Sequence, residues 1–335
     1  MPFDFQAFAK QVFAANGMRT DSNETIVFGR ELEQILAQSY DVKYVQNKGR
    51  AFVPFMTVGP GVDSVTYNTF DRSGPSASGS PSFIDTYGVA DFKNVSVKGK
   101  QSTTYFADIG NSYGYNLRDW QKAQQAGRPL DAMLARAARE DLESQLEMII
   151  AGGDSVHNLM GLTNSSDVTI INPTSTTGMS GGTWLGSGGG AGSATVQQIF
   201  SDLAFAMKKI WVDTKTIEEA DTVVFSSQMY AYLKTTLFQP TYNTKTVLQA
   251  LLDANPWIKN VDYWVQLDTR GADSKGRVLV YKKDPNIVQF MMGQDFTSSP
   301  PIVDGFGFRV LNMMRPGGLQ IRYPKAMLYI DGAEA

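Results

Sequence analysis

"PLDAMLARAAREDLESQLEMIIAGG", residues 129–153, carries an apolar side chain at every third or fourth position. This spacing places the apolar side chains on one side of an α-helix, in a stripe about five turns long. Pro129 stands near the first turn, where a missing N–H costs little, and Gly152 and Gly153 end the pattern. We therefore predict a helix over 129–151 that packs on a core through Leu130, Leu134, Ala138, Leu142, Leu146 and Ile149. Its charged residues are interpreted as solvated flanks, not as catalytic acids.

Two alternating segments precede this helix. "VDSVTYNTF" (62–70) and "FKNVSVKGKQSTTYF" (92–106) are rich in β-branched and aromatic residues, which favours strands. A run dense in Gly, Ser and Pro, Ser73 to Gly88, separates them and predicts a flexible tip. Both segments carry many polar residues on each face, so we expect a long two-stranded ribbon that cannot bury a core by itself. Such a ribbon must rest on something else, and another subunit is one candidate.

The remaining chain alternates between helical and strand patterns. A helical pattern occupies 24–44, and further helices are predicted over 194–212, 228–236 and 246–255, with a buried strand over 220–227. Residues 261–267 and 277–283 flank a polar run and predict a hairpin. The segment 307–331 predicts two or three strands that return to the sheet beside the long helix. Residues 194 to about 300 therefore indicate a mixed α/β module.

The composition excludes several function classes. The 335 residues include 42% hydrophobic and 19% charged residues, which is typical of a folded domain rather than a disordered chain. Thirty basic and 33 acidic residues give a net charge of -3, so no global positive field draws the chain to nucleic acid or to an anionic membrane. Cysteine is absent, which removes disulfides, thiolate nucleophiles and cysteine metal sites. We also expect no secretory signal and no membrane span.

Several local patterns are weak candidates for chemistry. "GSGGGA" (186–191) matches a dinucleotide-binding pattern with Asp213 beyond it, but no clear strand leads into it. We interpret the Gly-rich run from Gly178 to Ser193 as a mobile surface loop instead. The single histidine, His157, cannot form a triad or a two-histidine metal site within one chain and is interpreted as a surface residue.

Other polar and aromatic groups leave alternatives open. The spacing of Asp268, Asp273 and Asp284 does not fit an EF-hand. Three aromatic residues could stack a sugar or a base, although packing at the root of the ribbon and helix is favoured: Tyr113, Tyr115 and Trp120. A local basic face, or a set of solvated strand ends, is expected from Arg309, Arg315, Arg322 and Lys325.

The order of these elements resembles the major capsid proteins of tailed bacteriophages with the HK97-like fold. Local strings along nearly the whole chain strengthen the resemblance: "FGRELEQILAQSYDVKY", "VGPGVDSVTYNTFD", "IGNSYGYNLRDWQKAQQAGRPLDAMLARAAR", "GLTN" at 161–164 and "IRYPKAMLYIDG". None of these strings is a catalytic signature. Some relatives crosslink lysine to asparagine between subunits, but no motif transfers that reaction to a pair in this chain.

The resemblance implies an α+β, HK97-like capsid fold with four parts. They are an N-terminal arm (1–50), an extended loop (59–108), an axial domain (194–300), and a peripheral domain with the spine helix at about 129–151, formed by 51–58, 109–193 and 301–335. The implied function is a non-enzymatic major capsid protein that assembles into hexamers and pentamers of an icosahedral head around double-stranded DNA. No catalytic, cofactor or metal residues are implied.

The implied partners are other copies of the chain, with scaffold, portal and decoration proteins as further candidates and no membrane. The implied location is the virion, after assembly in the cytoplasm of a bacterial host. An encapsulin-like nanocompartment shell, which packages enzymes, is the first alternative. A hydrolase that acts through carboxylates brought together by folding is a remote one, because any two acids can converge in space.

Overall fold

The computed structural model describes residues 44–73, 95–127, 129–186, 189–239 and 243–334. Contacts divide the chain into two compact units, 1–46 and 47–335, and the helices and strands that the structure describes belong to the second. Most of the helical pattern over 24–44 and the predicted tip of the ribbon lie outside the described residues.

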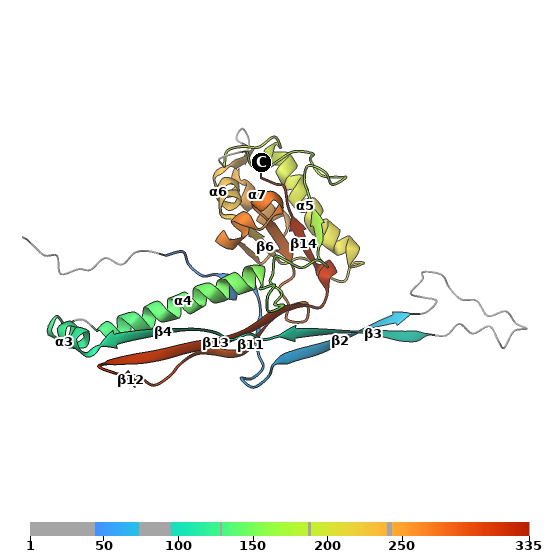
Figure 1. The fold of residues 1–335 in the computed structure, drawn as a ribbon. Helices are drawn as coiled ribbons and strands as arrows, with labels where there is room; N and C mark the ends of the chain where they lie inside the picture. The colour runs from blue at the N-terminus through green and yellow to red at the C-terminus, as the bar shows by residue number, and fades with distance from the viewer. Residues whose placement is uncertain (1–43, 74–94, 128, 187–188, 240–242, 335) are drawn as a thin grey trace, which may run out of the picture. The chain divides into compact units, whose positions relative to one another are not determined.

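One sheet is built around a single long strand, β13 (Gly307–Ile321). Strands β11 (Val288–Ser298), β12 (Ile302–Asp304) and β4 (Ile109–Asn116) pair with it antiparallel, and β1 (Phe55–Thr57) pairs with β11 in parallel. Helix α4 (Leu130–Gly152) lies along β4 and β13 in Figure 1. Asn111 on β4 donates to the carbonyl of Ala138 on α4 at 2.8 Å, so this face of the sheet is the one that the helix covers.

The predicted long helix is confirmed, and its burial follows the apolar stripe in its second half. Ala138, Leu142 and Leu146 are buried as expected, whereas Leu130 and Leu134 are only half-buried. At the end of the stripe the prediction is wrong by one residue, because Ile150 is buried and Ile149 is not. A further step of four from Leu146 reaches Ile150, so the stripe keeps the four-residue spacing of its neighbours.

A second five-stranded sheet has the order β5-β14-β10-β6-β9. Its strands are β5 (Thr169–Ile171), β14 (Met327–Ile330), β10 (Val278–Tyr281), β6 (Thr222–Phe225) and β9 (Asn260–Tyr263). Every residue of β6, β10 and β14 is buried, and helix residues join the same core cluster. The predicted helices are confirmed as α5 (Val196–Asp213), α6 (Ser227–Thr235) and α7 (Val247–Ala254). Capping boxes at Thr195 and Thr246 start α5 and α7.

The predicted hairpin between 261–267 and 277–283 is wrong. Strand β6 lies between β9 and β10, and β9 runs parallel to β6. The polar run that indicated a turn instead contributes to two short helices, η2 (Val265–Thr269) and η3 (Ala272–Ser274). Leu267 of η2 is buried, so the chain enters the core here instead of turning back beside β9.

The two sheets do not follow the ranges expected for the peripheral and axial domains. Strand β11 lies within 194–300 but pairs with β13, whereas β5 and β14 lie within the peripheral ranges but pair in the second sheet. Periodicity shows that a segment is a strand but does not name its partner. The domain ranges therefore stay predictions, and the sheets cross their boundaries.

The Gly-rich run is not a free surface loop in its described part. Trp184 and Leu185 are buried, and the Trp184 indole donates to Asp202 of α5 at 2.8 Å. The backbone N–H of Trp184 also donates to the carbonyl of Ala333 at 2.7 Å. Two apolar side chains inside a glycine-rich context were enough to fix this segment to the core, so the prediction of a mobile loop is wrong for these residues.

The remaining elements are short or paired only with each other. The expected ribbon is confirmed as β2 (Ser64–Ser73) and β3 (Ser96–Tyr105), which pair antiparallel along their whole length. A smaller hairpin joins β7 (Leu237–Gln239) and β8 (Asn243–Thr246). Short helices complete the fold: α2 (Gly49–Phe52), α3 (Leu117–Gln125) and η4 (Pro324–Ala326).

Candidate assembly surfaces

Within the described residues, the ribbon contacts the first sheet at its root. Phe106, just after β3, forms an isolated bridge with Gly317 of β13. Near this point Tyr67 donates its hydroxyl to the carbonyl of Ile321 at 3.4 Å, and Thr104 is buried. Val65, Tyr67 and Thr104 share one face of the ribbon, because β2 and β3 pair Val65 with Thr104 and side chains alternate along each strand. This face rests on the chain, and the other face is exposed.

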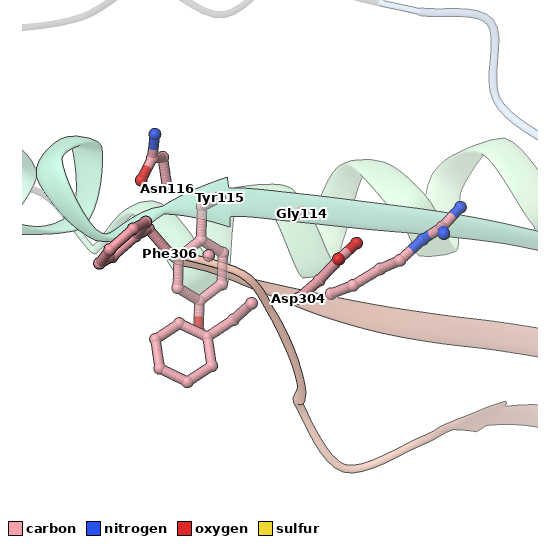
Figure 2. Close-up of a pocket in the computed structure, with 8 residues that line it drawn as sticks. Gly114, Tyr115, Asn116, Asp304 and Phe306 are labelled. Carbon is pink, nitrogen blue, oxygen red and sulfur yellow. The ribbon is translucent and has the colours of Figure 1, made fainter.

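The opposite end of the first sheet carries a hollow of about 400 Å³. Figure 2 shows Gly114, Tyr115 and Asn116 on β4 beside Asp304 at the end of β12 and Phe306 on the turn that follows. Gly305 adopts a φ of 59°, a left-handed conformation that favours glycine, and Phe306 beyond it is exposed. The hollow is open and polar-lined, which suits a contact surface better than an enclosed ligand site.

The three candidate stacking aromatics do not form one platform. Tyr113 donates to Asp131 of α4 at 3.4 Å, and Tyr115 packs on Phe308 with ring centroids 5.7 Å apart. Both tyrosines lie on the face of β4 that α4 covers, so packing near the helix is confirmed for them. They do not lie at the root of the ribbon, because they pair with Val310 and Phe308, whereas the root lies at Gly317. Trp120 lies on α3 and is exposed.

A buried carboxylate on α4 joins three parts of the fold, and the sequence did not indicate it. Glu147 accepts hydrogen bonds from the backbone N–H groups of Lys48, at 3.0 Å, and Gly49, at 2.6 Å. It also accepts from the indole of Trp264, at the start of η2. One feature of the sequence could have indicated that Glu147 is buried. It stands four residues before Ala151, which is buried, at the edge of the apolar stripe of α4. Glu147 therefore has a structural role.

The segment that Glu147 holds makes further contacts with the second sheet. The Lys48 ammonium lies 2.7 Å from the Asp262 carboxylate and 3.5 Å from the centroid of the Tyr263 ring. Tyr281 donates its hydroxyl to the carbonyl of Phe52 at 2.6 Å. Burial, with a contribution from Asp221, raises the pKa of Tyr281 well above its usual range, so this phenol stays protonated as a donor.

The remaining sequence candidates have local partners. His157 lies in an exposed turn and contacts Asp154, whose pKa is lowered by this hydrogen bond. Arg315 contacts Asp63 at 2.6 Å and Arg322 donates to Gln289 at 3.0 Å, so these two of the four predicted basic residues have partners. Arg309 donates to the Ser112 hydroxyl at 3.4 Å, and Lys325 is exposed.

Of the other acidic candidates, Asp268 caps α6 by accepting from the Ser227 N–H at 2.7 Å, and Asp213 pairs with Lys209 at 3.1 Å. Within the described residues no strand leads into the "GSGGGA" run, whose residues 187–188 lie outside the description. The same residues contain no group of three or more acidic or histidine side chains placed to hold a metal ion. None of their helices is long and apolar enough to cross a membrane.

The long helix on a sheet built around one strand, the second mixed module and the projecting ribbon define a capsid-type architecture. A family model described as "Major capsid protein" matches residues 83–333. The match covers more than half of the chain, so this chain belongs to the major capsid protein family and is a structural protein of a capsid. No curated protein matches it.

Solved structures share the fold at low sequence identity. The capsid of Myoviridae phage XM1 has a TM-score of 0.76 at 13% identity, over 91% of this chain and 98% of that chain. The Mycobacterium phage Che8 structure has a TM-score of 0.58 at 13% identity, over 92% and 100%. A virus-like particle from Pyrococcus furiosus has a TM-score of 0.54 at 14% identity, over 85% and 94%. These similarities confirm the predicted α+β, HK97-like fold.

Proposed function

We propose that this chain is the repeating subunit of an icosahedral phage head, in which it forms hexamers and pentamers around double-stranded DNA. The observation that carries this proposal is the ribbon. Each of its strands has ten residues, and in the described part of the chain these two strands pair only with each other. A two-stranded ribbon is marginally stable in water unless another surface covers it. In a shell, the neighbouring subunit supplies that surface.

The charge of the chain fits a container better than a DNA-binding protein. A net charge of -3 supplies no overall attraction to the phosphates of the enclosed DNA, so we expect only weak, non-specific contact with it. In the proposed head, the extended loop 59–108 reaches a neighbour and the axial domain meets other copies around the capsomer centre. Assembly takes place in the bacterial cytoplasm, and scaffold, portal and decoration proteins are candidate partners.

An encapsulin-like compartment is the second candidate, because the fold also resembles the virus-like particle from Pyrococcus furiosus. The family match to major capsid proteins favours the phage head. A phage head and an encapsulin-like compartment differ in what the shell contains. Particles purified from cells that carry the parent genome contain nuclease-protected DNA in the first case and a protein cargo in the second.

The assembly proposal is tested by electron microscopy of the purified chain beside a variant with a shortened ribbon. Phe70 and Gly99 face each other across the ladder, so replacing residues 71–98 with Asn-Gly closes the ribbon with a tight turn. We expect the full chain to form shells or capsomers, and the shortened chain to stay a folded subunit by circular dichroism without closing shells. Normal shells from the shortened chain would overturn the ribbon's role. An unfolded shortened chain would show that the ribbon belongs to the core.

A further inference from the structure

A hollow of about 420 Å³ lies beside the second sheet, where α5, the segment before β6 and the segment after α7 meet. Its volume is in the range of small-molecule sites, about 300–1,000 Å³. We call it the tryptophan hollow. Its lining includes Met207, Lys208 and Trp211 of α5, together with Glu219, Asn255 and Trp257.

Two indole rings supply the apolar part of the tryptophan hollow. Trp211 and Trp257 are each 42% exposed, whereas Met207 beside them in the lining is buried. Exposed large aromatic side chains that gather at one hollow are typical of a binding surface. The sequence did not indicate this pair, because the two tryptophans belong to different elements and line the same hollow only in the folded chain.

A nearly buried amide adds a free hydrogen-bond acceptor. Asn255 stands at the end of α7 and is only 8% exposed. Its Nδ2 donates to the carbonyl of Leu251 at 2.9 Å, which fixes the orientation of the side chain. Within the described residues no group donates to its Oδ1. Because a polar atom in such a site gains free energy from a partner, the Oδ1 is suited to accept from a bound molecule.

The charges at the tryptophan hollow cancel. Lys208 and Glu219 both line it, and neither has an ion pair within the described part of the chain. Their charged neighbours in the sequence, Lys209 and Glu218, each have an ion pair with another residue. The hollow therefore offers one charged donor and one charged acceptor without a net charge, which favours a neutral polar ligand over an anion or a cation.

Backbone hydrogen bonds hold the walls of the hollow together. Ile258, just after Trp257, is buried, and its N–H donates to the carbonyl of Asn255 at 3.1 Å. The N–H of Lys259 donates to the carbonyl of Asp221 at 2.8 Å, which joins the segment after α7 to the segment before β6. A site that is already formed loses little conformational entropy when a ligand binds.

We propose that the tryptophan hollow binds a neutral sugar, with a face of the sugar ring stacked on an indole and its hydroxyl groups bonded to Asn255, Glu219 and Lys208. A sugar ring has apolar C–H faces, and its hydroxyl groups both donate and accept hydrogen bonds. The hollow matches both properties. This inference concerns binding by the subunit itself and does not rest on the proposed function.

The site is suited to binding and not to cleavage. Hydrolysis of a glycosidic bond ordinarily uses two carboxylates that flank the bond. Glu219 is the one acid among the residues that line the hollow. We therefore expect a bound sugar to leave the site unchanged.

A peptide also carries donors and acceptors, but the structure favours the sugar. Peptides commonly bind by adding a strand to an open sheet edge or by laying a helix in a long groove. None of the residues that line the tryptophan hollow belongs to a strand, so the hollow offers no row of backbone groups to a peptide. Stacking of a flat ring needs only an exposed indole face, which the hollow supplies twice.

The test measures the binding of glycan probes to the purified full chain. The immobilised chain is incubated with fluorescent polymers that carry many copies of glucose, galactose, mannose or N-acetylglucosamine. Polymers that carry sialic acid or short peptides are tested in parallel. Probes with many copies are used because linking weak contacts raises the apparent affinity by about 10²–10⁴.

The variants are Trp211→Ala and Trp257→Ala. Their matched control is Trp120→Ala, which removes an indole that is 37% exposed on α3, outside the hollow. We expect at least one neutral sugar polymer to bind, each hollow variant to lower its binding by about tenfold, and the control to leave it unchanged. Circular dichroism checks that each variant is folded.

Several outcomes would overturn the proposal. They are the absence of binding by every neutral sugar polymer, binding that neither hollow variant lowers, and binding of the sialic acid or peptide polymers alone.

A second measurement keeps both tryptophans of the hollow in place. Of the five tryptophans, Trp184 and Trp264 are buried, so in the Trp120→Ala chain the quenching of fluorescence by acrylamide reports mainly on Trp211 and Trp257. Saturation with the free monosaccharide that the polymer assay selects should reduce this quenching. Unchanged quenching would show that the sugar does not cover these indoles, and the proposal would then be wrong.

Discussion

Replacing Glu147 with Gln tests whether the buried carboxylate on α4 holds the fold together. One carboxylate oxygen accepts from Lys48 N–H and from the Trp264 indole, and the other accepts from Gly49 N–H. A glutamine keeps the shape of the side chain but offers one acceptor oxygen and one NH₂ group. If its oxygen serves Lys48 and Trp264, its NH₂ group faces Gly49, and two donors then point at each other.

The magnitude follows from the bond that is lost and the donor that is left behind. A hydrogen bond to a charged group contributes about 1.5–3 kcal/mol, and a buried unpaired donor costs about 1–3 kcal/mol. These contributions overlap, so we expect Glu147→Gln to lower the free energy of unfolding by about 2–5 kcal/mol. Gly49→Ala should disrupt the same contact, because a Cβ at residue 49 would lie 2.6 Å from a carboxylate oxygen of Glu147.

Urea unfolding of the free subunit, followed by circular dichroism, measures the loss as a lower midpoint at unchanged slope. The matched control is Glu140→Gln on the same helix, where Glu140 makes an exposed ion pair with Arg136. That control should change the stability by less than about 1 kcal/mol. If Glu147→Gln falls within the range of Glu140→Gln, the three bonds to Glu147 do not stabilise the fold and the reasoning is wrong.

Three further substitutions test the burial of two core side chains and the ionisation of a buried tyrosine. Leu142→Ala should cost about 2–5 kcal/mol in the same assay, because Leu142 of α4 is fully buried in the core, and an unchanged midpoint would contradict its burial. Trp184→Ala should cost about 3–5 kcal/mol, whereas a free glycine-rich loop would tolerate it. Stability should fall as pH rises above 10.0, the ordinary pKa of tyrosine, because the unfolded phenol ionises there while Tyr281, whose pKa is raised, stays neutral when folded. Tyr281→Phe should weaken this alkaline loss, and an unchanged pH profile would contradict it.

The helices and the ribbon could be predicted because their signals are local. A stripe such as Leu142 and Leu146 needs only the geometry of one helix, and the ribbon needs only alternation on each side of a turn-rich segment. The main architecture also followed from the order of these elements. What the pattern could not supply was the partner of each strand, since β11 and β14 are both apolar and each joins a sheet outside its expected domain.

The residues whose roles could not be predicted from the sequence act through contacts with distant parts of the chain. Glu147 has the composition of a surface residue, and only the approach of Lys48 and Gly49, about a hundred positions earlier, makes it a buried acceptor. One face of the ribbon carries exposed apolar side chains, and this face was hidden for a related reason. Phe70 and Val97 belong to different strands, and they meet on one face only once the register between β2 and β3 is fixed.

A ribbon with open edges and an apolar face could associate with other chains, and its charged residues reduce this tendency. Both outer edges of β2 and β3 are unpaired in the described structure, and such edges can add strands from other chains without control. Lys98, Lys100 and Asp71 place charges along one face, which disfavours stacking of ribbons on each other, and the apolar area on the other face is limited to a few side chains. A contact of that size is weak when made once and becomes effective when a shell repeats it around every capsomer. In the proposed head, the ribbon would therefore stay soluble on a free subunit and still contribute to the contact with a neighbour.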